Sequence, residues 1–217
     1  MYHFVYTSTP IVDLPYKMTS KHTISRATLP ISKKTAQLAS KVIAITHGAG
    51  AIGSLLCEQA AIGGATVYSL DTDPDALARQ TISFRQNKLR VRGIPCYLDL
   101  KATVKRAIQE IVSHAPPIDH WIHAEKIDIQ DIICLRTSLS AIEAHFELRR
   151  KGSLTLLLTS SADAEKKNQG LKNMLHQITE KGIAVNLVYL DETPIIDIAS
   201  IVVSLPTNAA GIYEYSF

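Results

Sequence analysis

A glycine-rich turn behind a short strand pattern constrains this chain more than any other feature. Residues 41–46 form a β-branched apolar run, which is typical of a buried strand. Gly48, Gly50 and Gly53 follow it in a GxGxxG spacing. Glycine has no Cβ, so such a backbone can approach a pyrophosphate, whose charge is stabilised by the amides of a following helix. The turn therefore indicates a dinucleotide site.

The residues after the turn complete this pattern. An apolar-periodic segment predicts a helix over residues 51–62, and a second strand over 65–70 leads to Asp71. Strand, glycine turn, helix, strand and acid in this order are typical of a dinucleotide-binding half. The Asp71 carboxylate would accept hydrogen bonds from the adenosine ribose and repel a 2′-phosphate, which favours NAD over NADP.

Strand and helix patterns continue to alternate along the chain. They predict a single Rossmann-like domain over residues 38–217, with a doubly wound parallel sheet between two helix layers, a three-layer α/β/α class. After a helix opened by Asp73 and Pro74, helices are expected at 102–114, within 129–149, at 171–181 and at 195–204. Further strands are expected at 96–98, 119–123, 153–159 and 183–189.

The first 37 residues differ from the rest. Residues 1–37 have no persistent period and carry three prolines with many Ser and Thr residues, which predicts an extended N-terminal arm. Its apolar side chains would lie along a partner or along the arm's own domain. Basic and hydroxyl residues are plentiful there and acids are scarce, so a targeting segment is the alternative, although no amphipathic Arg-rich helix is evident.

Charge and cysteine content exclude some classes of protein. The net charge is +3, but residues 1–40 carry five basic residues and one acid, so the remainder sums to −1 and does not indicate nucleic-acid binding. The spacing of the three cysteines, Cys57, Cys96 and Cys134, fits neither a disulfide framework nor a metal site. The protein is therefore expected in a reducing compartment, with the cytoplasm as the first choice and an organelle matrix as the second. The apolar runs are too short for a transmembrane segment.

The glycine turn also resembles that of the short-chain dehydrogenase/reductase family. The family's Thr-Gly-x-x-x-Gly-Ile-Gly is similar to residues 46–53, although His47 and Ala51 occupy two of the glycine positions. Asp71 matches the NAD-selecting acid of the family, and Asp99 with the next leucine resembles the pair whose carboxylate contacts the adenine amino group.

Two further motifs extend the resemblance over residues 38–217. Residues 117–119 read Pro-Ile-Asp, and residues 182–186 are similar to the family's Gly-Ile-Arg-Val-Asn. The resemblance implies that a bound NAD would contact Thr46, Gly48, Gly50, Ile52, Gly53, Asp71, Asp99 and Leu100.

The motifs that carry chemistry in this family are missing or altered. Its Asn-Asn-Ala-Gly reads His-Ala-Glu-Lys at 123–126, so charged residues stand where small ones let the cofactor pass. The family's catalytic tyrosine and lysine would fall within 160–182, and this segment contains no tyrosine. No asparagine occurs within 127–151, where the family's helix donates one, and the Pro-Gly after the last strand reads Leu190-Asp191.

Few candidates for catalysis remain, and each has a plainer interpretation. Ser160 directly follows the strand predicted at 153–159 but has no base at a recognisable spacing. Tyr189 is either a replacement acid or a packing residue at a strand end. His123 and His47 flank the expected cofactor cleft. Their imidazoles would serve as general bases near neutral pH, or the two are ordinary residues of a turn and a strand end. The lysines at 166–167 would replace the family lysine that binds the nicotinamide ribose, or they belong to the solvated start of a helix.

These losses predict a catalytically degenerate member of the fold that serves as a structural or regulatory subunit, with or without NAD(H). Family members pair through the helices expected within 129–149 and at 171–181, and both are shortened, so protein partners are expected there and at the arm. One alternative is an NAD(P)-dependent oxidoreductase that acts on a carbonyl or hydroxyl substrate with relocated groups. The other is an NAD(H) sensor without chemistry.

Overall fold

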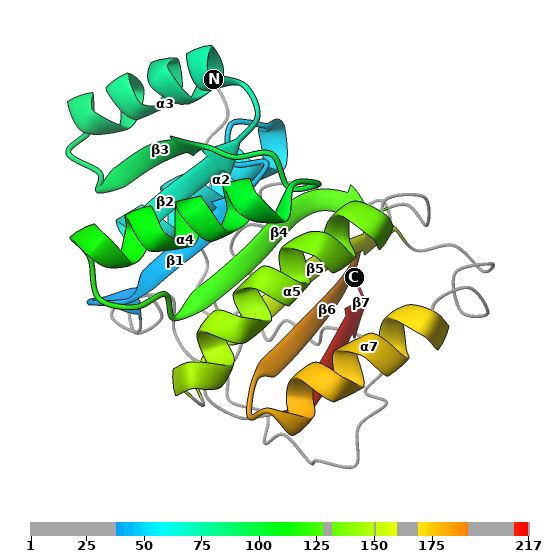
Figure 1. Ribbon diagram of the computed structural model, residues 1–217. Coiled ribbons are helices and arrows are strands. Elements are labelled where there is room, and N and C mark those ends of the chain that lie inside the picture. Colours follow the sequence, from blue (N-terminus) through cyan, green and yellow to red (C-terminus); the bar gives the residue numbers. More distant parts are fainter. Residues whose placement is uncertain (1–37, 128–131, 150, 160–168, 191–210, 217) are drawn as a thin grey trace, which may run out of the picture.

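One parallel sheet runs through the described part of the chain (Figure 1), which in this computed structural model comprises residues 38–127, 132–149, 151–159, 169–190 and 211–216. The strand order is β3-β2-β1-β4-β5-β6-β7, so the order reverses between β1 and β4. Ligands of such sheets bind outside the carboxyl ends of the strands at this reversal. The strands are β1 Val42–Thr46, β2 Thr66–Asp71, β3 Val91–Pro95, β4 His120–Ile127, β5 Ser153–Thr159, β6 Ala184–Leu190 and β7 Gly211–Ser216.

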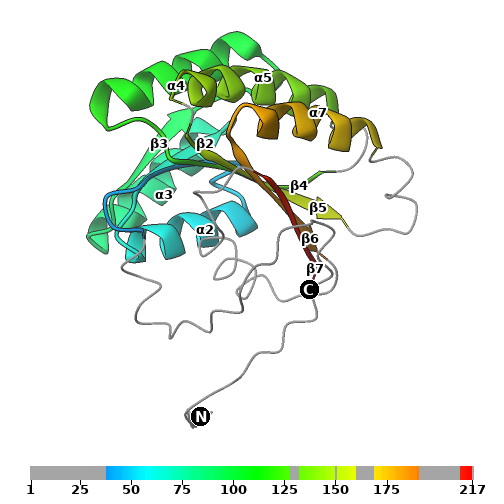
Figure 2. The same cartoon turned by 90° about the horizontal axis from the view of Figure 1, so that it is seen from below.

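Helices cover both faces of the sheet, which confirms the predicted three-layer architecture. They are α2 Ala51–Ile62, α3 Pro74–Gln86, α4 Lys101–His114, α5 Ile132–Arg149 and α7 Gln169–Glu180. Figure 2 shows α2 and α3 on one face and α4, α5 and α7 on the other. Alternate residues of β1 accordingly enter two separate cores: Ile43 and Ile45 pack on the α2 side, while Val42 and Ala44 pack on the opposite side.

Local signals place the first two helices as predicted. The bounds of α2 match the expected 51–62. At α3, the Asp73 Oδ1 atom accepts hydrogen bonds from the amides of Asp75 and Ala76, both at 2.9 Å, and Pro74 occupies the first helical turn. A capping carboxylate and a proline that needs no hydrogen-bond partner fix this helix start.

The Asp119 carboxylate holds β1, β4 and α5 together. Its Oδ2 atom accepts a hydrogen bond from the Val42 amide at 3.0 Å. Its Oδ1 atom lies 3.9 Å from the Arg149 guanidinium and 4.0 Å from the Lys41 ammonium. The Pro-Ile-Asp motif is therefore a structural brace at the amino ends of the central strands.

The expected position of β3 was wrong. The sequence predicted a strand at 96–98, whereas the strand is Val91–Pro95. Gly93 and Pro95 disfavour a strand interior, but β3 forms the edge of the sheet, where a proline without an amide hydrogen costs little. Pairing of Val91 with Val67 and of Ile94 with Leu70 therefore overrides local propensity.

The last strand, β7, was not anticipated. Residues Gly211–Ser216 pair in parallel with β6 and extend the sheet at its second edge. The helix expected at 195–204 and the arm at 1–37 lie outside the described residues. No helix in the described part of the chain is long and apolar enough to span a membrane.

A buried histidine predicts pH-dependent stability. His120 is 1% exposed with its Nε2 atom 2.7 Å from Thr155 Oγ1, and burial lowers its pKa to about 3. An unfolded imidazole titrates near 6.5, so acid favours the unfolded chain below that pH, by about 1.4 kcal/mol per pH unit for this residue.

Urea unfolding between pH 7 and pH 4.5 measures this effect. As the pH falls, the free energy of unfolding should decrease less steeply in the His120→Asn variant than in the unmodified protein. The difference in slope should correspond to about one proton taken up on unfolding. Carboxylates titrate in both proteins, so the difference in slope isolates the imidazole. Equal slopes would show that His120 does not resist protonation in the folded state.

Candidate functional site

Two glycines make the turn between β1 and α2 sterically close-packed. A Cβ on Gly53 would lie 2.0 Å from the His47 carbonyl oxygen, and one on Gly48 would lie 2.2 Å from Ser69 Oγ. Gly50 is more open, because its Cβ would meet only the His47 oxygen, at 3.2 Å. Gly48 and Gly53 therefore serve packing within the turn, and Gly50 leaves its outer side free.

The amino end of α2 is suited to an anion. Gly50 caps this helix without a side-chain hydrogen bond, and no acid lies in the first turn. Backbone amides at a helix start are otherwise unpartnered and carry partial positive charge. This end retains the backbone features of a phosphate site.

Asp71 is held against the turn by two backbone amides. Its Oδ2 atom accepts a hydrogen bond from the Ala49 amide at 3.0 Å, and its Oδ1 atom accepts one from the Asp73 amide at 3.3 Å. Gln80 of α3 supports the same turn, because it donates to the Gly48 carbonyl and accepts from Ser69 Oγ. Nothing in the sequence marks Gln80 for this role.

Three side chains with metal-binding atoms meet beside this turn. The His47 Nε2 atom lies 2.8 Å from Glu125 Oε2, a contact between the turn after β1 and the end of β4 that is an ion pair when the imidazole is protonated. The rings of His47 and His123 meet edge to face, with centroids 5.2 Å apart. His47 adopts φ +50°, a left-handed conformation that favours glycine. The register of β1 with β4, which pairs Thr46 with His123, brings these segments together.

His123 is buried and oriented by Thr46. Its Nδ1 atom lies 3.0 Å from Thr46 Oγ1, and the residue is 5% exposed. Burial, and then the neighbouring His47, lower the pKa of His123 to about 3. The expectation that this imidazole titrates near neutral pH was therefore wrong, since it stays neutral through the physiological range.

The other predicted site residues are scattered. Thr46 is fully buried, and Ile52 packs against the core on the α2 side. Asp99 and Leu100 are exposed in the loop between β3 and α4, and among the described residues Asp99 has no hydrogen bond to the glycine turn. Tyr189 is partly buried against the core on the α5 side, as its packing interpretation expects. Ser160 and the lysines at 166–167 lie outside the described residues.

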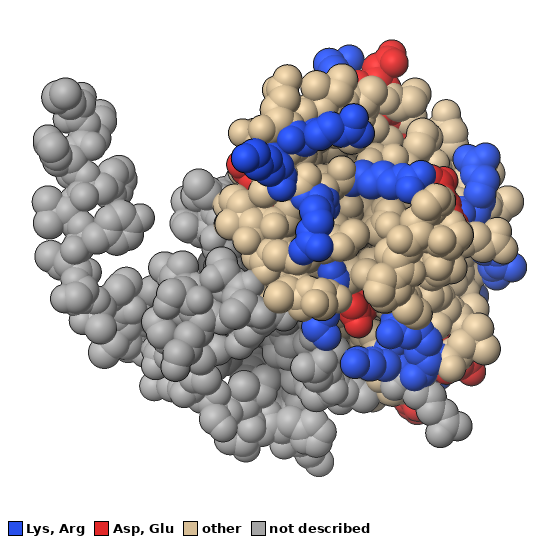
Figure 3. All heavy atoms as spheres, turned by 90° about the vertical axis from the view of Figure 1, so that its left-hand side faces the viewer, with Lys and Arg blue, Asp and Glu red and all other residues tan. Residues whose placement is uncertain are grey.

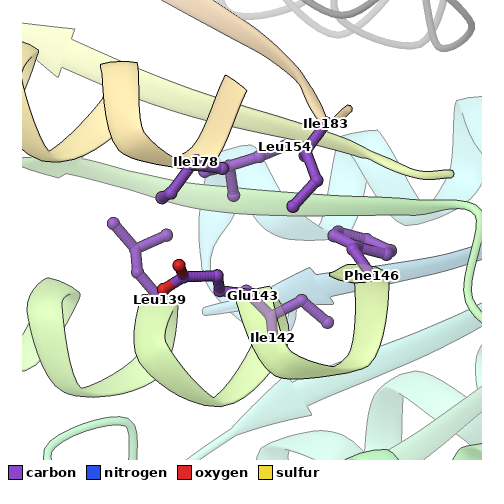
Figure 4. A pocket seen from close by; sticks show the side chains of 7 residues that line it. All are labelled: Leu139, Ile142, Glu143, Phe146, Leu154, Ile178 and Ile183. Carbon is purple, nitrogen blue, oxygen red and sulfur yellow. The ribbon is translucent and has the colours of Figure 1, made fainter. Parts of the chain in front are cut away.

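A narrow hollow between α5 and α7 is a poor candidate for a functional site (Figure 4). Six of its seven lining residues are buried and apolar, and the seventh is Glu143. The Glu143 carboxylate pairs with the Lys181 ammonium at 2.6 Å. The hollow therefore offers no unpaired polar group to orient a ligand. Its lining residues are Leu139, Ile142, Glu143, Phe146, Leu154, Ile178 and Ile183.

Basic side chains gather at the sheet edge formed by α3, β3 and α4. Figure 3 shows Lys and Arg side chains spread over this edge with few acids between them. The exposed basic residues of this segment are Arg79, Arg85, Lys88, Arg90, Arg92, Lys101, Lys105 and Arg106. This edge is thus basic although the net charge of the chain after residue 40 is near zero. The absence of nucleic-acid binding stays a prediction.

Comparison with solved structures identifies the fold. The chain is similar to a hydroxysteroid dehydrogenase from Escherichia coli, with TM-score 0.67, 15% identity, and coverage of 85% of this chain and 98% of that one. It is also similar to a short chain dehydrogenase from Mycobacterium smegmatis, with TM-score 0.65, 17% identity, and coverage of 82% and 92%. The described domain therefore has the fold of short-chain dehydrogenases.

A third similar structure contains a cofactor. It is a metagenomic short-chain oxidoreductase in complex with NADP, with TM-score 0.63, 12% identity, and coverage of 82% of this chain and 97% of that one. No family model matches this sequence, and no curated protein matches it. The similarity is therefore one of backbone fold, and it gives no information on the side chains around the glycine turn.

Proposed function

We propose that this chain is a short-chain-dehydrogenase-like protein that no longer transfers hydride and serves as a structural or regulatory subunit of a larger assembly. The observation that carries the proposal is the ion pair between His47 and Glu125. In the family that the sequence resembles, these positions hold glycine and alanine, whose small size lets a dinucleotide lie against the turn. Here two larger side chains meet across the same space.

The Glu125 carboxylate opposes a dinucleotide by charge as well as by size. The amino end of α2 would attract a diphosphate, but the Glu125 carboxylate stands beside the same turn and its side chain is 55% exposed. Like charges about 4 Å apart repel by roughly 1–4 kcal/mol, depending on how well water screens them. Cofactor affinity should therefore be weak, and NAD would be preferred to NADP because of Asp71.

The residues that would transfer a proton also support the proposal. Residues 160–182 contain no tyrosine. Tyr189 packs against the core, which disfavours the alternative of an NAD(P)-dependent oxidoreductase with relocated groups. A subunit role would use the arm at 1–37 together with α5 and α7. Leu148, 90% exposed near the end of α5, is an apolar side chain suited to a protein contact.

One specific observation favours a second candidate function. Asp71 is held in place by the Ala49 amide, and the start of α2 has no capping side chain. These features would suit a protein that binds NAD(H) without reacting with it. In that sensor, Asp71→Ala should remove the binding of NADH.

Two measurements test the proposed function. The first follows NADH and NADPH absorbance with the purified full-length chain and a panel of aldehydes and ketones, together with the reverse reaction on alcohols. We expect no rate above the protein-free blank. Turnover that Tyr189→Phe abolishes would contradict the proposal and establish the relocated enzyme.

The second measurement addresses the subunit role. In an extract of the native cells, the tagged chain should migrate in an assembly much larger than its own mass of 23.8 kDa. Deletion of residues 1–37 should shift it toward the monomer. A full-length chain that migrates as a monomer in that extract would contradict the subunit role.

A further inference from the structure

We propose that His47, His123 and Glu125 form a binding site for a divalent transition metal, with zinc as the ion that best fits two imidazoles and one carboxylate. Each residue offers one ligand atom, and these atoms all lie within 4.8 Å of one another. They come from two segments that are distant in sequence, the turn after β1 and the end of β4. Two histidines and a glutamate are a donor set that zinc accepts in proteins.

The side chain of His123 is already oriented as a metal ligand. Thr46 Oγ1 donates a long hydrogen bond of 3.5 Å to the Ile122 carbonyl and lies 3.0 Å from His123 Nδ1. In the tautomer whose Nδ1 carries the proton, Nδ1 donates to Thr46 Oγ1 and the Nε2 atom carries the lone pair that a metal ion needs. Metal-binding histidines are commonly fixed in this way by a partner on the other ring nitrogen.

The other two ligands can adjust to an ion. Zinc bonds of about 2.1 Å in tetrahedral geometry put ligand atoms about 3.4 Å apart. The widest separation in the cluster is at most 4.8 Å, while His47 Nε2 and Glu125 Oε2 are 2.8 Å apart. The His47 and Glu125 side chains are 32% and 55% exposed, so they are free to move by the required ångström or so. His123 stays fixed in the core.

The backbone conformation of His47 is an independent indication of a ligand-binding site. A residue with a Cβ at φ +50° costs roughly 1–2 kcal/mol relative to glycine. An exposed ion pair contributes only about 0–1 kcal/mol, so the pair with Glu125 does not by itself offset this cost. Strained residues of this kind cluster at ligand-binding sites. Three protein ligands would leave a fourth position for water or an anion near the amino end of α2.

Zinc titration of the full-length chain tests the site, after chelation and removal of the chelator. Calorimetry with zinc chloride should show one ion per chain with a Kd in the micromolar range or tighter. Glu125→Gln should weaken binding by about 10-fold or more, and His47→Gly, which suits the left-handed backbone, by about 100-fold or more. Thr46→Val should weaken it by about 10-fold through loss of the His123 partner.

The matched control is His176→Ala, which removes an exposed histidine of α7 and should leave the affinity unchanged. Cobalt in place of zinc should give intense visible absorption bands with the unmodified chain and weak ones with Glu125→Gln, a change on an exposed side chain that keeps the fold. Absence of stoichiometric zinc binding would overturn the proposal. Equal affinity in His47→Gly and the unmodified chain would also overturn it.

The titration contains no nucleotide, so its outcome is separate from the proposed function. A chain that binds zinc and also turns over NADH would contradict only the loss of hydride transfer. A chain that does neither would contradict only the metal site.

Discussion

Replacement of Gly53 by alanine should destabilise the protein by about 2–4 kcal/mol. The new Cβ would lie 2.0 Å from the His47 carbonyl oxygen and 2.7 Å from Gly48 Cα. These are backbone atoms, so the turn must shift to relieve the contact. Alanine is the better helix former by about 1 kcal/mol, and this gain reduces the loss but does not cancel it. Urea unfolding followed by circular dichroism measures the difference.

Gly50→Ala is the matched control for this prediction. The substitution is the same and lies in the same turn, but the added Cβ would be 3.2 Å from its nearest contact, and Gly50 has φ −71°. We expect it to cost about 1 kcal/mol or less, mainly because alanine is a poorer helix cap than glycine. Equal losses in the two variants would mean that the turn is not packed as described.

The double variant His47→Gly with Glu125→Ala should bind NADH at least about 10-fold more tightly than the unmodified chain. Glycine suits the φ of +50° at position 47, and neither partner of the lost His47–Glu125 contact is buried, so the fold should tolerate both changes. Removal of the carboxylate ends a repulsion of roughly 1–4 kcal/mol toward a diphosphate. Calorimetric titration, with a chelator present to exclude metal effects, measures the gain.

The single variant His47→Gly separates the effect of position 47 from that of Glu125. It clears space at the turn but leaves the Glu125 carboxylate unpaired, so it should gain less affinity than the double variant. A single variant that gains as much as the double would show that His47 alone obstructs the cofactor.

The parts of the fold that local signals specify were predictable from the sequence. The bounds of α2 and the capped start of α3 follow from a glycine turn and from an aspartate before a proline. β3 was misplaced because Gly93 and Pro95 read as a strand boundary, whereas its position at the sheet edge tolerates both. β7 was missed because its only strand partner in the described part of the chain is β6, on the other side of residues 191–210, and no local signal reports that pairing.

Some single residues around the glycine turn could be singled out from the sequence, but their arrangement could not. Gly48, Gly53 and Asp71 lie together, as the spacing of the motif indicated. His47 and Glu125 were each identified as obstacles to a cofactor, yet their pairing depends on the register between β1 and β4. Side chains 78 positions apart carry no sequence signal of such a contact.

The most direct test of the proposed function is the titration of NADH into the unmodified full-length chain, with NADPH in parallel. The proposal predicts no saturation at about 1 mM cofactor, which corresponds to a binding free energy weaker than about −4 kcal/mol. Micromolar binding of NADH, about −8 kcal/mol, that the double variant does not improve would contradict the claim that His47 and Glu125 obstruct the cofactor site.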